Sequence, residues 1–212
     1  MIARRELLLL AALAAAGPAL AAPRPVVTIL GDSITAGFGL PAAQAFPARL
    51  QEDLTRAGAQ VLIRAAGVSG DTTAGGLARV DFSVQPDTTI CLVALGGNDL
   101  LQGVDPKVTR ANLEAIITRL TRRHIRVILA GLKPPPAIGR SYAREFTALY
   151  ANLARTHHLT LYPDLLAGVG PGLRQRDGLH PNAQGAQVIA TGLAPVITTA
   201  LKGSKSKSWS IS

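Results

Sequence analysis

Four short polar segments of the sequence together contain the residue types that are needed to attack a carbonyl compound. They lie at residues 31–35 (GDSIT), 67–72 (GVSGDT), 96–99 (GGND) and 176–182 (RDGLHPN). A serine hydroxyl is a weak nucleophile until a neighbouring base takes its proton. Ser33 in the first segment and His180 in the last are a candidate nucleophile and base, because imidazole exchanges protons near neutral pH.

The same segments could orient that base and stabilise the charge that the attack creates. Asp177 stands three residues before His180, so a tight turn would let its carboxylate accept a hydrogen bond from the imidazole Nδ1–H. Asn98 offers a side-chain NH₂, and Gly70 and Ser33 offer backbone N–H groups. These three donors could stabilise an oxyanion, so the sequence predicts a catalytic group of Ser33, Asp177 and His180 beside them.

Each segment by itself also has a plainer interpretation. Ser69 is a rival nucleophile, although the strand predicted before it is weaker. An Asp-x-x-His pair can be a capping or surface pair, or supply half of a metal site. The sequence GGND is common in turns, because Asn and Asp tolerate left-handed backbone. Four segments with complementary roles, each next to a predicted element, favour one catalytic site that needs neither a metal nor a cofactor.

Motifs of several other enzyme classes do not occur in the sequence. Thr35 stands where a G-x-S-x-G elbow has its second glycine, which argues against the α/β-hydrolase type of site. No G-x-G-x-x-G follows the first predicted strand, and neither a P-loop nor an H-E-x-x-H motif is present.

Short apolar runs alternate with helical patterns and predict an α/β fold. The expected strands lie at residues 26–30, 61–63, 89–95, 125–129 and 159–162. Between and after them, apolar residues recur at helical spacing, which predicts a parallel sheet covered by helices on both faces. Ligands of such sheets bind beyond the carboxyl ends of the strands, where the polar segments are expected to meet.

Composition narrows the class of protein further. The chain has 212 residues, 48% of them hydrophobic, and one cysteine, Cys91, which excludes a disordered chain and a disulfide scaffold. The net charge of +9 comes from scattered basic residues, and aromatic residues make up only 4%. This pattern does not predict a nucleic-acid partner.

Both ends of the sequence differ from its body. Residues 1–21 combine a basic start, an apolar run and an A-x-A site, which predicts a signal peptide cut after Ala21; an uncleaved anchor is the alternative. Residues 22–202 form the predicted catalytic domain, and 203–212 a flexible Ser/Lys-rich tail. The expected product is periplasmic or secreted and has no stable membrane anchor after cleavage.

The four segments resemble, in order and spacing, the four blocks of the SGNH (GDSL-type) hydrolases, in particular the periplasmic thioesterase I, lysophospholipase and arylesterase branch. The resemblance implies Ser33 as nucleophile, Gly70 and Asn98 as oxyanion donors, and Asp177 and His180 as the rest of a triad. It also implies a flavodoxin-like three-layer α/β/α sandwich, a five-stranded sheet of order 2-1-3-4-5, no cofactor, and a small acyl ester or lipid as substrate.

Two alternatives to an acyl esterase remain open on the sequence: a carbohydrate acetylesterase on the same fold, and a non-catalytic acyl-lipid-binding module. A complete set of nucleophile, base and donors argues against the binding module. Ile34 and Thr35 depart from the commoner Leu-Ser of the family, but leave the implied catalytic positions unchanged.

The remaining polar residues near the segments are assigned supporting roles. Asp32 is expected to order the turn around Ser33, and Asp71 and Asp99 to anchor loops. Lys133, together with the prolines that follow it, is expected to form a stiff wall of the site. Three further histidines lie at predicted helix ends and are interpreted as structural: His124, His157 and His158.

Overall fold

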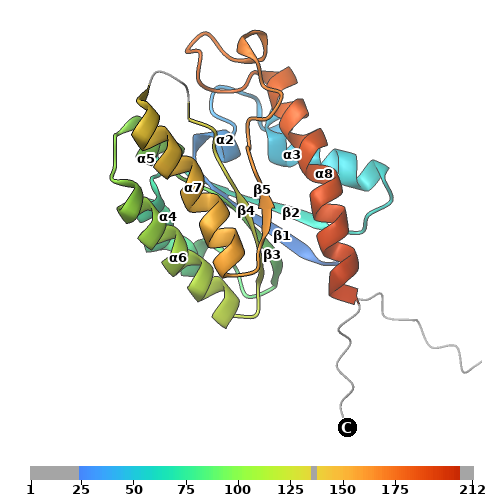
Figure 1. The fold of residues 1–212 in the computed structure, drawn as a ribbon. Helices are drawn as coiled ribbons and strands as arrows, with labels where there is room; N and C mark the ends of the chain where they lie inside the picture. Colours follow the sequence, from blue (N-terminus) through green and yellow to red (C-terminus); the bar gives the residue numbers. More distant parts are fainter. Residues whose placement is uncertain (1–23, 135–137, 206–212) are drawn as a thin grey trace, which may run out of the picture.

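A parallel sheet runs through the centre of the part of the chain that the computed structural model describes, residues 24–134 and 138–205 (Figure 1). Its strands are β1 (Val26–Gly31), β2 (Leu62–Gly67), β3 (Thr88–Ala94), β4 (Arg126–Ala130) and β5 (Thr160–Tyr162). The spatial order is β2-β1-β3-β4-β5, and every neighbouring pair is parallel. The predicted five-stranded sheet of order 2-1-3-4-5 is confirmed.

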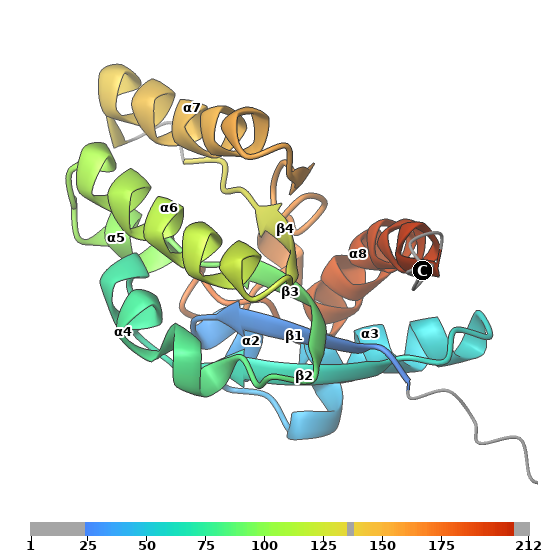
Figure 2. The same ribbon diagram turned by 90° about the horizontal axis from the view of Figure 1, so that it is seen from below.

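Helices cover both faces of the sheet. They are α2 (Ser33–Ala36), α3 (Phe46–Arg56), α4 (Thr73–Ser83), α5 (Gly97–Leu101), α6 (Pro106–Arg122), α7 (Arg140–Thr156) and α8 (Ala183–Lys205). Figure 2 shows α4, α6 and α7 on one face, and α3 and α8 on the other. The predicted three-layer sandwich is therefore confirmed.

The strands form because their apolar runs can be buried on both faces at once. Val27 and Ile29 of β1 pack into the cluster on the α3 and α8 face, and Leu30 packs into the cluster on the α4, α6 and α7 face. All three side chains have no exposed surface. Burying one such side chain contributes about 1.5–3 kcal/mol, so the central strands hold the two helical layers together.

The structure differs from the sequence-based boundaries at β2 and at the end of α8. β2 continues to Gly67, four residues beyond the predicted end at Ile63, because its pairing with β1 persists after the apolar run stops. α8 continues to Lys205, so 203–205 belong to a helix and not to the predicted tail. Arg126 donates hydrogen bonds to the carbonyls of Ala200 and Gly203, which supports this last part of α8.

The other terminal predictions lie outside the described residues. These are the signal peptide at 1–21 and the rest of the tail at 206–212. Within 24–134 and 138–205, no helix combines the length and the apolar character needed to cross a bilayer.

The register of the central strands places three of the four polar segments side by side. Gly31, the last residue of β1, pairs with Gly67 at the end of β2 and with Ala94 at the end of β3. The three strands therefore end at the same level, on the same edge of the sheet.

Candidate active site

Ser33 begins α2 immediately after β1 ends. Asp32 is the N-cap of α2, and its Oδ1 accepts a hydrogen bond from the Ile34 N–H over 3.0 Å. This cap turns the chain sharply from strand to helix, as the sequence predicts for Asp32. The Ser33 side chain is left at the floor of a cavity, with 9% of the residue exposed.

A chain of hydrogen bonds joins Ser33 to residues near the other end of the sequence. His180 Nε2 lies 2.8 Å from Ser33 Oγ, and His180 Nδ1 lies 2.6 Å from Asp177 Oδ2. Asp177 Oδ1 accepts two further bonds, from the backbone N–H groups of Leu179 and His180. Both ring nitrogens of His180 are thus engaged, which leaves neither of them for Ser69, the rival nucleophile on the rim of the same cavity.

The hydrogen bond with the His180 ring, helped by those two backbone N–H groups, lowers the pKa of Asp177 to about 2. The carboxylate, whose side chain is 38% exposed, is therefore ionised at any ordinary working pH. An ionised partner that accepts the Nδ1–H holds the imidazole ring in one orientation and one tautomer.

The loop that carries this pair is held by residues that the sequence analysis did not single out. Gln175 donates through Nε2 to the carbonyls of Phe38 and Pro181, over 2.7 and 3.0 Å. The Phe38 ring packs on the His180 ring, with centroids 4.6 Å apart. Gly39 makes room for Gln175, because a Cβ there would lie 2.2 Å from Gln175 Oε1. No local pattern marks Gln175 as important, since its partner Phe38 lies 137 residues away.

The two other predicted oxyanion donors belong to the segments after β2 and β3, a part of the cavity lining that the His180 loop does not form. Gly70 stands in a tight turn with φ +84°, a left-handed conformation that glycine adopts without strain. Asn98 is the second residue of α5 and donates through Nδ2 to the Asp71 carbonyl over 2.8 Å. That bond fixes the amide and uses one of its two N–H groups. Gly70, Asn98 and Ser33 all line the same cavity.

Asp99 anchors the segment that carries Asn98, as the sequence predicts. It is 1% exposed, and its Oδ2 accepts the Thr73 backbone N–H over 2.7 Å. Its Oδ1 accepts the hydroxyls of Thr73 and Thr109. The carboxylate therefore ties α5 to the start of α4 and to α6.

Asp32 is a second buried carboxyl group in the wall of the cavity. Burial raises its pKa to about 6, against the opposing effects of the Ile34 N–H and of His180. Its Oδ2 points toward Gly97, where a Cβ would stand 3.2 Å away. Asp32 thus lies between the Ser33 turn and the strand end that leads to Asn98.

The cavity has a volume of about 750 Å³ and a largely apolar lining. Its apolar wall consists of Ile34, Phe38, Leu100, Leu101, Leu132, Pro134, Leu166, Val169 and Leu179. Lys133 and Pro134 belong to the lining, as predicted for a wall, whereas 135–137 lie outside the described residues. A space of this size and character suits an acyl chain.

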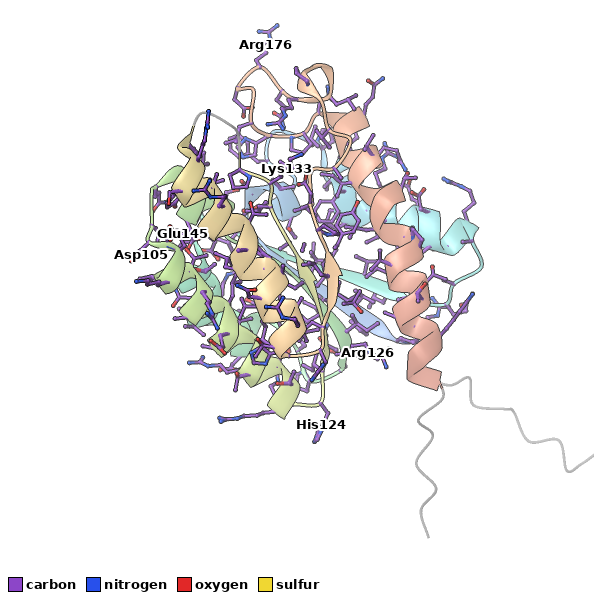
Figure 3. All side chains as sticks on the ribbon, in the orientation of Figure 1. Asp105, His124, Arg126, Lys133, Glu145 and Arg176 are labelled. Carbon is purple, nitrogen blue, oxygen red and sulfur yellow. The ribbon has the colours of Figure 1, made fainter. Side chains whose placement is uncertain are left out.

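Figure 3 shows where three other basic residues lie in the molecule. Lys133 lies near the sheet edge where the polar segments meet, and Arg176 points outward from the tip of the His180 loop. His124 lies at the opposite end of the molecule, where it follows α6 with φ 58°.

In 24–134 and 138–205, no group of three or more His, Cys, Asp or Glu side chains is placed to hold a metal ion. Cys91 is fully buried in β3, and burial raises the pKa of its thiol to about 12.

Comparison with known proteins decides the family. The GDSL-like Lipase/Acylhydrolase family model matches residues 29–188, which include all four polar segments. The chain belongs to this family. It is 36% identical to esterase TesA of Pseudomonas aeruginosa over 156 residues, which cover 72% of the chain and 78% of that relative. It is 34% identical to the thioesterase 1/protease 1/lysophospholipase L1 of Escherichia coli K12 over 177 residues, 82% of the chain and 84% of the relative.

A solved structure agrees with the family assignment. AlinE4, an SGNH-hydrolase family esterase, superposes with a TM-score of 0.71 at 40% identity, over 84% of this chain and 97% of that chain. The GDSL-family membership and the esterase and thioesterase names of the relatives together support an ester-hydrolysing enzyme.

Proposed function

We propose that this GDSL-family enzyme is an exported serine esterase that acts on acyl esters through an acyl-enzyme intermediate. The observation that carries the proposal is the continuous hydrogen-bond chain from Ser33 through His180 to Asp177, at the floor of an apolar cavity. A nucleophile, a base and an oriented carboxylate at these distances are what acyl transfer requires.

In the first half of the reaction, Ser33 Oγ attacks the ester carbonyl carbon while His180 Nε2 accepts the hydroxyl proton. The resulting imidazolium is stabilised by the ionised Asp177 on Nδ1. The carbonyl oxygen becomes an oxyanion. Breaking the bond to the leaving group then restores the carbonyl, and His180 gives its proton to the departing alcohol or thiol.

The oxyanion is bound by the Ser33 and Gly70 backbone N–H groups and by the second N–H of the Asn98 amide. The Asp71 carbonyl holds that amide in place through its first N–H. Donors that are already oriented cost no reorganisation when the charge develops, which is why such groups accelerate acyl transfer.

In the second half, water replaces the alcohol. His180 accepts a proton from water as the water oxygen attacks the acyl-Ser33 carbonyl, and the same donors hold the second oxyanion. His180 then protonates Ser33 Oγ, and a carboxylic acid leaves. No metal or cofactor takes part in these steps as we propose them.

The cavity supports the proposed substrate class. Its apolar wall favours esters of hydrocarbon acyl chains over acetyl groups on a sugar. The thioesterase and lysophospholipase names of the E. coli relative support thioesters and lysophospholipids as further substrates. The signal-like residues 1–21 support export to the periplasm or the medium.

Fluorophosphonate labelling combined with an ester series tests the proposal. The probe should form one covalent adduct, on Ser33, and Ser33→Ala should lose both the adduct and the hydrolysis of p-nitrophenyl esters. Ser69→Ala is the matched control and should still be labelled on Ser33. An adduct on Ser69, or folded wild-type protein that neither reacts nor hydrolyses any ester from acetate to palmitate, would contradict the proposal. Activity confined to acetyl groups on sugars would favour the carbohydrate acetylesterase instead.

A further inference from the structure

An ion pair outside the cavity lining supports the segments that carry the proposed nucleophile and the proposed oxyanion donors. Arg79 on α4 donates through Nε to Asp71 Oδ2 over 2.6 Å. The side chains are 18% and 16% exposed, so the pair is largely shielded from water. An ion pair that is shielded from water is weakened less by dissolved salt than an exposed pair is.

The rest of the Arg79 guanidinium binds backbone carbonyls at the ends of two strands. Nη2 donates to the Gly31 carbonyl over 2.8 Å, and Nη1 donates to the Ala66 carbonyl over 2.9 Å. Gly31 ends β1 directly before Asp32 and Ser33, and Ala66 is the penultimate residue of β2. A planar guanidinium can hold several acceptors in fixed directions at once, which a lysine ammonium cannot do in the same geometry.

The turn that contains Gly70 also rests on the Gly31 carbonyl. The Val68 N–H donates to that carbonyl over 3.1 Å, and the Asp71 N–H donates back to the Val68 carbonyl over 3.2 Å. The carbonyl at the end of β1 therefore accepts from both the Gly70 turn and Arg79. A shift of the guanidinium would move the turn and the Ser33 strand end relative to each other.

Asp71 connects Arg79 to Asn98 through two hydrogen bonds. Its carboxylate is held by Arg79, and its backbone carbonyl accepts the bond from Asn98 Nδ2. Gly75 allows the arrangement, because a Cβ at that position would lie 2.5 Å from Asp71 Oδ1. The Asp71 carboxylate can lie against the first turns of α4 only where the helix has no side chain.

We propose that Arg79 is the positioning residue of the oxyanion hole, an inference that rests on the proposed esterase function. Arg79 is not among the residues that line the cavity, so it acts through the groups that it holds. By binding Gly31, Ala66 and Asp71 together, it sets the distance between Ser33 and the two donors contributed by other segments.

Steady-state kinetics of Arg79→Met test this inference. Misplacing a catalytic group by about 1 Å can cost about 100-fold in rate. We expect kcat for a short-chain p-nitrophenyl ester to fall about 10- to 100-fold, with KM changed less than about threefold. The matched control is Arg64→Met on β2, which removes a bidentate pair with Asp87 outside the cavity lining. That control should keep kcat within about twofold.

A double-mutant cycle separates positioning of the donors from a general loss of structure. Losses from independent sites multiply, whereas losses that act through one group do not. If Arg79 acts through the donors, Arg79→Met should cost at least threefold less in an Asn98→Ala background than in wild type. An equal loss in both backgrounds, or a kcat of Arg79→Met within twofold of wild type, would overturn the inference.

Asp71→Asn enters the same cycle if Arg79→Met does not fold, as judged by circular dichroism. This variant keeps the Arg79 bonds to the Gly31 and Ala66 carbonyls and weakens only the bond to the Gly70 turn. Its kcat loss should be smaller and should also shrink in the Asn98→Ala background; an equal loss overturns the inference. Failure of the proposed function is distinguished from these outcomes, because wild-type enzyme would then hydrolyse no p-nitrophenyl ester.

Discussion

The two sides of the cavity are built in opposite ways. On one side, the His180 loop is exposed and its central contact is local, between His180 and an Asp177 only three residues earlier. On the other side, Gly70 lies in the loop after β2 and Asn98 in α5 after β3, and their supports are shielded polar groups that bridge distant parts of the chain.

The difference reflects what each side is proposed to do. A base needs one hydrogen bond to the nucleophile and one partner behind it, and a short turn is enough to supply that partner. Oxyanion donors must converge on one point from separate elements, and they stabilise charge only if they do not move. A network that includes Asp99 and the Arg79–Asp71 pair provides that rigidity. The comparison predicts that damage to the two sides will have different kinetic signatures.

The largest effect is expected on the base side, with His180→Ala. Loss of the proposed base, which is bonded to Ser33, should lower kcat/KM at least about 10⁴-fold. In wild type, kcat/KM should fall as pH is lowered, because a protonated imidazole cannot accept the Ser33 proton. His180→Ala should lose this pH dependence. The check is kcat/KM against pH, with His157→Ala, which removes a surface pair with Glu114, as a control that keeps both rate and profile.

A smaller effect is expected on the donor side, with Asn98→Ala. The amide is proposed to bind charge that exists only in the transition state, so kcat should fall about 10²–10³-fold with little change in KM. The pH profile should keep its shape at a lower plateau. Asn152→Ala, on α7 and outside the cavity lining, should stay within about twofold of wild type. An increase in KM alone would show that Asn98 binds substrate and is not an oxyanion donor.

The Asp32→Asn substitution should change the free energy of unfolding in a pH-dependent way. The folded-state pKa of about 6 lies above the ordinary value of 3.8, so ionisation of Asp32 destabilises the folded protein as pH rises through about 6. Asn keeps an oxygen for the Ile34 N–H and carries no charge. The variant should be more stable than wild type by up to about 3 kcal/mol at pH 8, and the difference should vanish near pH 4.

Urea unfolding at both pH values measures this shift. Asp81→Asn is the control, because Asp81 is 63% exposed and pairs with Arg119 at the surface. Its stability should change by less than about 1 kcal/mol, in the destabilising direction. If Asp32→Asn destabilises the protein equally at pH 4 and pH 8, the buried carboxylate is a net support of the fold and not a cost.

The smallest effect is expected from chelation. If both sides of the cavity work as proposed, EDTA and added zinc should leave turnover unchanged, since Asp177 and His180 serve a triad and not a coordination shell. The measurement is kcat after dialysis against EDTA, compared with dialysis against buffer alone. Loss of activity that a divalent ion restores would mean that a metal takes part, and the assignments of both sides would have to be revised.

The sequence by itself determined the layers of the fold and the local chemistry of the base side. Fully buried strands such as β3 have near-continuous apolar runs, so their positions could be predicted to within a residue or two. β2 was predicted too short, because an edge strand pairs through its backbone and needs no apolar side chains after Ile63. The Asp177–His180 spacing already implied their contact, since three residues of a tight turn bring the two side chains together.

Only the tertiary structure decided how the donor side is held. Arg79 follows Asp71 by eight residues, and no turn or helix repeat at that spacing marks the pair as neighbours of Ser33. Their meeting depends on where α4 packs beside the ends of β1 and β2, and on the room that Gly75 leaves. Gln175 is the same case on the base side, because its bond to the Phe38 carbonyl exists only after 137 residues of chain have folded between them. Contacts of this kind are set by packing between elements, which local sequence patterns do not encode.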